Sequence, residues 1–446
     1  MSSQHSGPGV DDLKQRVAEV LALARKLGAS QAQATVSFGT GLSVNVRMRE
    51  VETLEFHRDQ GMAITVYFGQ RKGSASTSDL GTAALGESVR KACTLARYTT
   101  EDNYAGLADP DRLVRVPPDL DLHHPWVLDA DAAIDLATRC EAAALDSDAR
   151  ITNSEGAGVS THDGCRASGN SHGFLAGYRD THHSVSCAVI ASHGEQMERD
   201  FDYTTARHPD DLGAAAQIGR EAARRACARL GAVKVDTCNA PVLFPARLAR
   251  GLIGHLVGAV SGGALYRKSS FLLDSLGTSV LAPCVTIDER PHLPRGLASA
   301  PYDDDGVATT DRRVVEAGVL NGYFLSSYSA RRLGLATSGN AGGPHNLVVA
   351  DTGASAADLL AAMGTGFMVT ELMGSGVNPV TGDYSRGAAG FWVEGGEVKF
   401  PVSEVTIAGN LKDMFRAIVG IGTDTDLRGG IRTGSILVRE MTIAGS

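Results

Sequence analysis

Hydrophobic and polar positions follow two different periods along the first half of this 446-residue chain. From Asp11 to Leu27 apolar residues recur every three to four positions, and Gly28 follows, which predicts a capped amphipathic helix. From 32 to 77 apolar and polar residues alternate, with turn signals at 39–41 and 59–61, which predicts an antiparallel meander with one polar face. Further helices are expected over 82–98, 130–146 and 210–230, and a second strand-rich stretch over 150–205.

The second half of the chain is dominated by short strand patterns. Hairpins are predicted at 314–320 and around 394–396, a strand over 436–443, and helices only over 249–258 and 356–363. The order of elements predicts an α+β fold. Its N-terminal half would hold antiparallel meander sheets in two α+β lobes, and its C-terminal half a curled antiparallel sheet or sandwich with few helices. A composition shift near 231–240 divides the chain into a flexible tail (1–9), an N-terminal α+β domain (10–235) and a C-terminal β-rich domain (236–446).

Composition and charge exclude several classes of function. The net charge is −9 and no Lys/Arg run exceeds two residues, which disfavours nucleic-acid binding. No stretch has the apolar length of a membrane span, and the first nine residues lack the apolar core of a signal peptide. The seven cysteines are scattered without a Cys-x-x-Cys pair, as is typical of reduced thiols, so a cytoplasmic location is expected.

The helix predicted over 249–258 carries one histidine, His255. A zinc hydrolase helix needs two imidazoles on one face and a carboxylate beside them to activate the metal-bound water. Five residues before His255 stands Arg250, whose fixed positive charge would repel a dication, and Gly251 beside it offers no ligand. Arg250, Gly251 and His255 therefore predict a degenerate site, with no metal and no catalytic residue in this chain.

That helix and five further segments resemble the PmbA (TldE) branch of the TldD/PmbA family of zinc metallopeptidases, also described as modulators of DNA gyrase. In the TldD branch the helix reads His-Glu-x-x-x-His, and the third zinc ligand is a cysteine near the C-terminus. Here the last cysteine is Cys284, and the corresponding region, 424–434, contains none. The further segments occur in the family's order, and 169–173 matches more diffusely; they are 271–277, 339–346, 370–374, 381–388 and 401–414.

The resemblance implies a metal-free subunit that completes a heteromer with a zinc-bearing, TldD-type catalytic chain, and a homodimer when no such chain is available. It also implies hydrolysis of unfolded or short peptides, including peptide-precursor processing and antitoxin degradation. Whether this chain has activity of its own stays open. One alternative is an independent metallopeptidase with a site rebuilt from His255, Glu371 and Asp383. Another is a non-enzymatic regulator that binds a toxin or DNA gyrase.

Three other groups of residues are candidates for chemistry. A polar loop in an apolar region is a candidate for peptide or partner contact, together with Glu371; its residues are Asp383, Tyr384, Ser385 and Arg386. The acidic run 302–306 lacks the spacing of a calcium loop and is interpreted as a solvated turn. Five histidines between 162 and 193 fit no ligand pattern, and the adjacent His182 and His183 should point to opposite faces of a strand.

Overall fold

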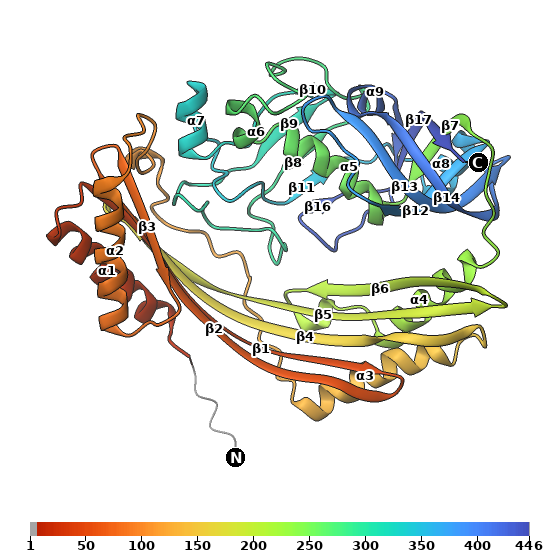
Figure 1. Ribbon diagram of the computed structural model, residues 1–446, viewed down its shortest axis with the longest axis horizontal. Coiled ribbons are helices and arrows are strands. Elements are labelled where there is room, and N and C mark those ends of the chain that lie inside the picture. Colours follow the sequence, from red (N-terminus) through yellow and green to blue (C-terminus); the bar gives the residue numbers. More distant parts are fainter. Residues whose placement is uncertain (1–6, 446) are drawn as a thin grey trace.

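The computed structural model describes residues 7–445 and folds them into two β-rich halves that face each other (Figure 1). The N-terminal half is built on one antiparallel sheet with strand order β3-β2-β1-β4-β5-β6. The two lobes expected from the sequence share this sheet, because β1 pairs along most of its length with both β2 and β4. The strands are β1 (Gln31–Arg47), β2 (Glu50–Phe68), β3 (Arg71–Thr77), β4 (Ile151–Asn170), β5 (Leu175–His193) and β6 (Gln196–Ala206).

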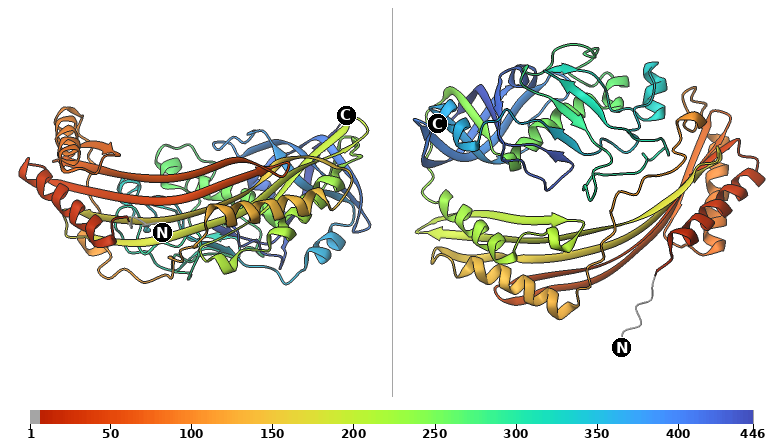
Figure 2. Two further views of the ribbon diagram at one scale, coloured as in Figure 1. Left: turned by 90° about the horizontal axis from the view of Figure 1, so that it is seen from below. Right: turned by 180° about the vertical axis from the view of Figure 1, so that it is seen from behind.

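Two pairs of helices cover the convex face of this curved sheet (Figures 1 and 2). Helices α1 (Val10–Lys26) and α2 (Thr82–Tyr98) pack on one end, and α3 (Ala130–Leu145) and α4 (Ala215–Arg229) on the other. Alternate residues of β1, among them Val36 and Val44, are buried under these helices. The intervening positions of β1 are mainly polar or glycine and line the concave face, as the period-two pattern predicted.

The turn between β1 and β2 is held by a buried carboxylate. Met48 and Arg49 form the two-residue connection, and both have positive φ angles, which non-glycine residues seldom adopt. The side chain of Glu141 on α3 is fully buried and accepts hydrogen bonds from the backbone N–H groups of Met48 (2.8 Å) and Arg49 (2.7 Å). These two bonds stabilise a turn that the residue types alone do not favour.

The C-terminal half contains two sheets. The larger has the order β14-β13-β12-β7-β17-β15 and, because β14 also pairs with β17, five of its strands close into a ring. The smaller has the order β10-β9-β8-β11-β16. The larger comprises β7 (Cys238–Phe244), β12 (Gly366–Met373), β13 (Asp383–Glu394), β14 (Glu397–Asn410), β15 (Ile418–Ile421) and β17 (Ile436–Ala444); the smaller comprises β8 (Ile287–Glu289), β9 (Arg312–Glu316), β10 (Val319–Leu320), β11 (Leu347–Val349) and β16 (Ile431–Arg432).

Up to residue 445, five helices accompany these sheets, and the α+β class and the curled C-terminal sheet predicted from the sequence are confirmed. The sequence predicted antiparallel pairing, but two strand pairs, β7 with β12 and β11 with β16, are parallel. No helix within residues 7–445 is long and apolar enough to cross a membrane. The helices are α5 (Ala246–Ala259), α6 (Gly262–Tyr266), α7 (Ser327–Leu333), α8 (Ala356–Met363) and α9 (Leu411–Arg416); short 3-10 helices lie at Pro110–Arg112 and Pro209–Asp211.

The acidic turn is not solvated throughout, which corrects the sequence interpretation. Asp304 is exposed, but Asp303 is buried and accepts hydrogen bonds from the backbone N–H groups of Asp305, Val307 and Ala341. Burial, together with the nearby charge of Asp305, raises the pKa of Asp303 to about 7, although the three N–H donors act in the opposite direction.

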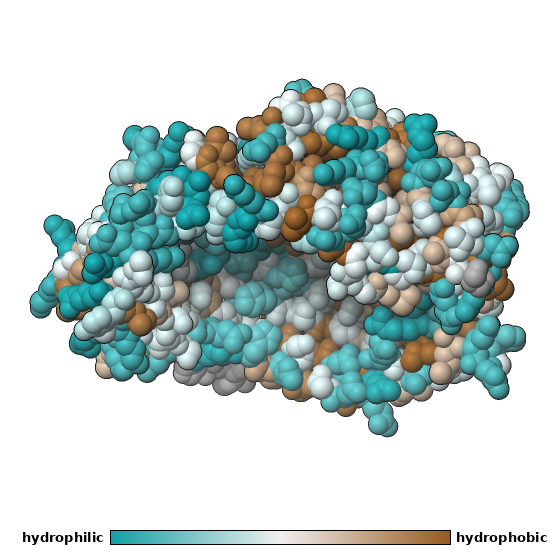
Figure 3. Space-filling view, turned by 45° about the horizontal axis from the view of Figure 1, so that its top comes forward, coloured by the Kyte–Doolittle hydropathy of each residue, from teal (hydrophilic) through white to brown (hydrophobic). Residues whose placement is uncertain are grey.

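The two halves touch at both ends and leave a hollow between them (Figure 3). At one end Phe174 of the N-terminal half packs against Tyr302 and Val307. There the Tyr328 hydroxyl also donates a hydrogen bond of 2.8 Å to Asp102. At the other end β6 and α4 meet α5, β12 and the loop 424–428. The concave face of the N-terminal sheet and one side of the C-terminal half therefore bound the hollow.

Candidate functional site

Helix α5 carries the residues singled out by the sequence. Leu252, Ile253 and Leu256 recur at helical spacing and bury one face in the C-terminal core. The opposite face carries three glycines, Gly251, Gly254 and Gly258, and a Cβ atom added at any of them would have no neighbour within 4 Å. The helix is thus anchored by its apolar side and presents an open, small-residue side.

Arg250 is built into the contact between the two halves. Its Nη1 donates hydrogen bonds to the Tyr203 hydroxyl on β6 (2.8 Å) and to the backbone carbonyl of Arg428 (3.2 Å). The guanidinium groups of Arg250 and Arg428 lie 6.0 Å and 4.7 Å from the centre of the Tyr203 ring. Arg250 on helix α5 and Arg428 in the loop 424–428 therefore lie side by side, so the two segments that the family resemblance relates to metal binding meet in the fold.

His255 faces β13. Its ring meets Tyr384 edge to face, with 5.8 Å between the ring centres. Burial lowers the pKa of His255 below its usual value, and the positive charge of Arg386 lowers it further, so the site favours the neutral imidazole. Within residues 7–445 no hydrogen bond to this imidazole is present, and the Nε atom of Arg386 is buried without an acceptor.

The other candidate residues separate into three places. Tyr384 is buried against His255, so Asp383 and Ser385, its neighbours in the strand, point to the opposite face and are exposed. There Asp383 accepts hydrogen bonds from Thr381 and Asn410. Glu371 forms an ion pair with Arg229 of α4. The trio His255, Glu371 and Asp383 is therefore not assembled in one site.

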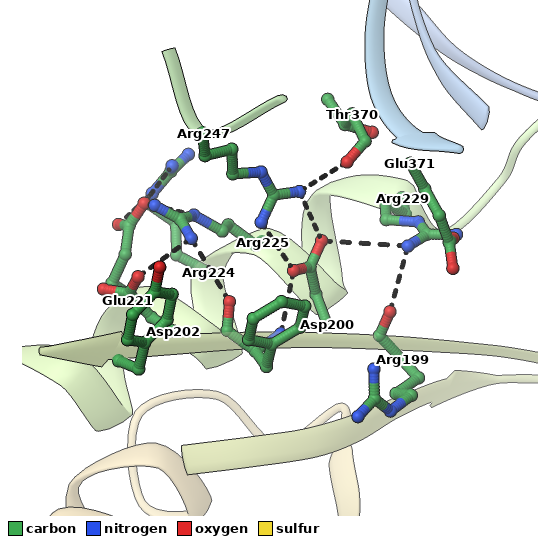
Figure 4. Close-up of polar contacts among 12 residues, drawn as sticks. Arg199, Asp200, Asp202, Glu221, Arg224, Arg225, Arg229, Arg247, Thr370 and Glu371 are labelled. Carbon is green, nitrogen blue, oxygen red and sulfur yellow. Dashed lines mark hydrogen bonds and ion pairs between the residues drawn. The ribbon is translucent and has the colours of Figure 1, made fainter. Parts of the chain in front are cut away.

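A charged network at the contact between the halves was not predicted from the sequence (Figure 4). Asp200 of β6 is buried and lies 3.1 Å from Arg247 of α5, which also donates a 2.7 Å hydrogen bond to the Thr370 carbonyl. Asp202 pairs with Arg428 at 2.9 Å. The two partners of each pair are far apart in the chain and belong to different elements, so no local motif marks them.

The network surrounds an interdomain cavity of about 570 Å³. Arginines from both halves line it next to apolar groups such as Met368 and Phe391, and each of these arginines already faces a carboxylate. Among residues 7–445, no three His, Cys, Asp or Glu side chains lie close enough together to hold a metal ion.

His183 is buried and His182 is exposed, which confirms that they point to opposite faces.

Family models cover most of the chain. Residues 32–96, 123–230 and 237–445 match the PmbA/TldA metallopeptidase domain 1, central domain and C-terminal domain. The chain belongs to the PmbA/TldD metallopeptidase family, as the sequence motifs implied. It is 52% identical to metalloprotease PmbA of Escherichia coli O157:H7 over 93% of this chain and 92% of that protein, and 47% identical to the PmbA homologue of Haemophilus influenzae over 98% and 96%.

Solved structures show the same architecture. A candidate modulator of DNA gyrase from Bacteroides thetaiotaomicron has a TM-score of 0.93 and 27% identity, covering 98% of this chain and 99% of that one. TldE from Thermococcus kodakarensis has a TM-score of 0.83 over 96% of this chain and 100% of that one; at 20% identity it supports the fold alone.

Proposed function

We propose that this chain is the metal-free subunit of a heteromeric zinc peptidase of the TldD/PmbA type. The observation that carries the proposal is the position of Arg250. Where the related zinc helix has its first histidine, this helix has a guanidinium group bound to Tyr203 and to the Arg428 carbonyl. A side chain used in this way to join the two halves cannot also serve as a metal ligand.

The remaining residues of the helix also do not fit a zinc ion. Gly251 supplies no carboxylate to activate a water molecule, although the space in front of it is open. A zinc-bound histidine almost always donates its other ring N–H to an acceptor, and within residues 7–445 His255 has none. Loop 424–434 contributes Arg428, already engaged with Asp202 and Asp426, instead of a cysteine. We therefore assign no chemical step to this chain.

The contribution of this chain would be to shape the hollow in which peptides are held. Its concave wall is polar, so it suits unfolded or short peptides rather than an apolar ligand. The zinc of a TldD-type partner would supply the activated water for hydrolysis. We infer a cytoplasmic location from the seven unpaired cysteines, and we expect a homodimer when the chain is purified alone.

The structure disfavours an independent metallopeptidase, because its three candidate residues are engaged elsewhere or face apart: Glu371 with Arg229, Asp383 with Thr381 and Asn410, and His255 with Tyr384. The related Bacteroides thetaiotaomicron protein is described as a modulator of DNA gyrase, so a regulator that binds DNA gyrase is a second candidate function. A gyrase regulator would bind gyrase without needing a zinc-bearing partner, so the two candidates differ in the complex that they form.

The test is metal analysis of the chain purified without chelator, followed by a peptide-cleavage assay with a chain that carries the intact His-Glu-x-x-x-His helix. We expect no stoichiometric zinc in this chain alone, because an incomplete ligand set does not retain the metal. In the reconstituted complex His255→Ala should cost about 1–3 kcal/mol of stability and leave most of the cleavage activity. One tightly held zinc per chain, or loss of cleavage with a normal melting temperature, would contradict the proposal.

A further inference from the structure

Strand β2 has a free edge along more than half of its length. It pairs with β1 from Glu50 to Tyr67 on one side, but with β3 only from Met62 to Phe68 on the other. Within residues 7–445 no strand pairs with the outer side of Glu50–Gly61, and nearly every residue of this segment is exposed. Backbone N–H and C=O groups along such an edge are an open template for another strand, which proteins normally cover or disrupt.

The two faces of this edge differ in chemistry. Opposite residues of paired strands share a face, and Val51, Leu54 and Phe56 lie opposite Val46, Val44 and Leu42, which are buried on the convex face. The three edge residues extend that apolar layer to the edge of the sheet, and they are 46%, 43% and 72% exposed.

The concave face of the same edge is acidic. Glu55 and Asp59 lie opposite Ser43 and Gly39, whose side of β1 faces the hollow. Glu50 lies opposite Arg47, and the extra residue of the bulge, Glu52, contacts Arg47 and Asn45. Four carboxylates thus follow one face of a twelve-residue edge, while Arg58 lies over Phe38.

We propose that the edge Glu50–Gly61 of β2 binds an extended strand of a second, non-identical chain, in which apolar residues alternate with lysine or arginine. The free backbone groups would form the ladder, the apolar side chains would pack beside Leu54 and Phe56, and the basic ones would pair with the acidic row. Two copies of this chain would not pair here, because two-fold pairing sets one acidic row against another, and like charges across strands are destabilising. The inference rests on the proposed function, since it gives the unlike partner subunit a docking strand.

The test uses the full chain and a fluorescent, end-capped peptide of twelve alternating lysine and valine residues. We expect binding by fluorescence anisotropy, at least tenfold tighter than for the matching glutamate–valine peptide. A lysine–valine peptide N-methylated at alternate residues, which cannot complete a ladder, should bind at least tenfold more weakly. Hydrogen exchange should slow at amides within 50–61.

Charge exchange separates a specific strand site from general attraction to an acidic protein. The variant Glu55→Lys/Asp59→Lys should reverse the preference and select the glutamate–valine peptide. The control Glu394→Lys/Glu397→Lys makes the same charge change on an exposed hairpin of the C-terminal half and should leave the preference as in the wild type. Both variants alter exposed side chains, so their melting temperatures should match the wild type.

The proposal is overturned if the lysine–valine peptide does not bind, if both variants behave alike, or if exchange protection falls outside 50–61. These results are independent of zinc and of cleavage. A chain found to hold zinc would refute the metal-free subunit but not the strand site. Failure of strand binding would leave the metal-free subunit standing.

Discussion

Burial and hydrogen bonding shift the pKa of the Asp303 carboxyl group in opposite directions. Because burial and Asp305 prevail, the pKa of Asp303 in the folded chain, about 7, lies above its ordinary value of 3.8. Between these two values the folded state binds more protons than the unfolded state, so stability from this group is full at low pH and is lost as pH rises to 7. The loss is on the order of 4 kcal/mol, since the pKa differs by about three units and each unit corresponds to about 1.4 kcal/mol.

Asp303→Asn should remove this pH dependence. The amide oxygen can accept only part of the three N–H bonds, so the variant should be less stable than the wild type at pH 5, with the difference shrinking toward pH 8. Urea unfolding at the two pH values measures the difference. Asp304→Asn, at the exposed neighbour, serves as control and should show no such change. A wild-type advantage that grows toward pH 8 would contradict the raised pKa.

Among the elements, the β1–β2 hairpin depends on a residue nearly one hundred positions away. Glu141→Gln keeps one acceptor but turns an amide N–H₂ toward a second backbone donor, so we expect a loss of about 1–3 kcal/mol. Thermal melts of this variant should be compared with Asp146→Asn, which alters only the exposed ion pair with Arg49 and should cost less than about 1 kcal/mol. Equal effects of the two changes would show that the buried carboxylate does not hold the turn.

Local hydrophobic periodicity was enough to predict most helices and strands. It could not predict which strands pair when they lie far apart in the sequence. The helix over 82–98 was predicted with the bounds that it has, because its pattern and its ends are local. The β1–β4 pairing, which merges two expected lobes, depends on contacts across more than a hundred residues and has no local signal. The predicted helix over 210–230 starts later in the structure. The short 3-10 helix Pro209–Asp211 comes first, and α4 begins at Ala215 rather than Asp210.

The candidate site shows the same limit. His255 and Arg250 were found from spacing on one helix, whereas the Tyr203 partner of Arg250 comes from a strand that nothing in the helix identifies. The family segment 339–346 was identified by resemblance without a role. In the structure Asn340 and His345 hydrogen-bond the buried Glu289 (2.7 and 2.8 Å), so at least these two residues of the segment stabilise the core of the C-terminal half.

At the scale of the whole molecule, the charged network holds the two halves together beside the cavity. Arg247→Ala should leave the buried Asp200 with the more distant Arg229 (3.7 Å) as its one ion-pair partner among residues 7–445, at a cost of about 2–4 kcal/mol. Small-angle X-ray scattering should then show a larger radius of gyration as the halves separate. Arg224→Ala, which breaks an exposed pair with Glu221 on the same cavity, should change neither property appreciably. A compact, fully stable Arg247→Ala variant would show that apolar contacts alone close this end.

The role of Arg250 also has an evolutionary consequence. Because its guanidinium binds Tyr203 and the Arg428 carbonyl, Arg250→His would remove one hydrogen bond between the halves and one within the C-terminal half before any metal could compensate. A zinc site in this chain would require several substitutions together, at 250, at 251 and within 424–434, and the first of them is harmful alone. In the proposed heteromer, this contact would therefore maintain the division of labour between this chain and a zinc-bearing partner, because the first substitution toward a zinc site would be costly.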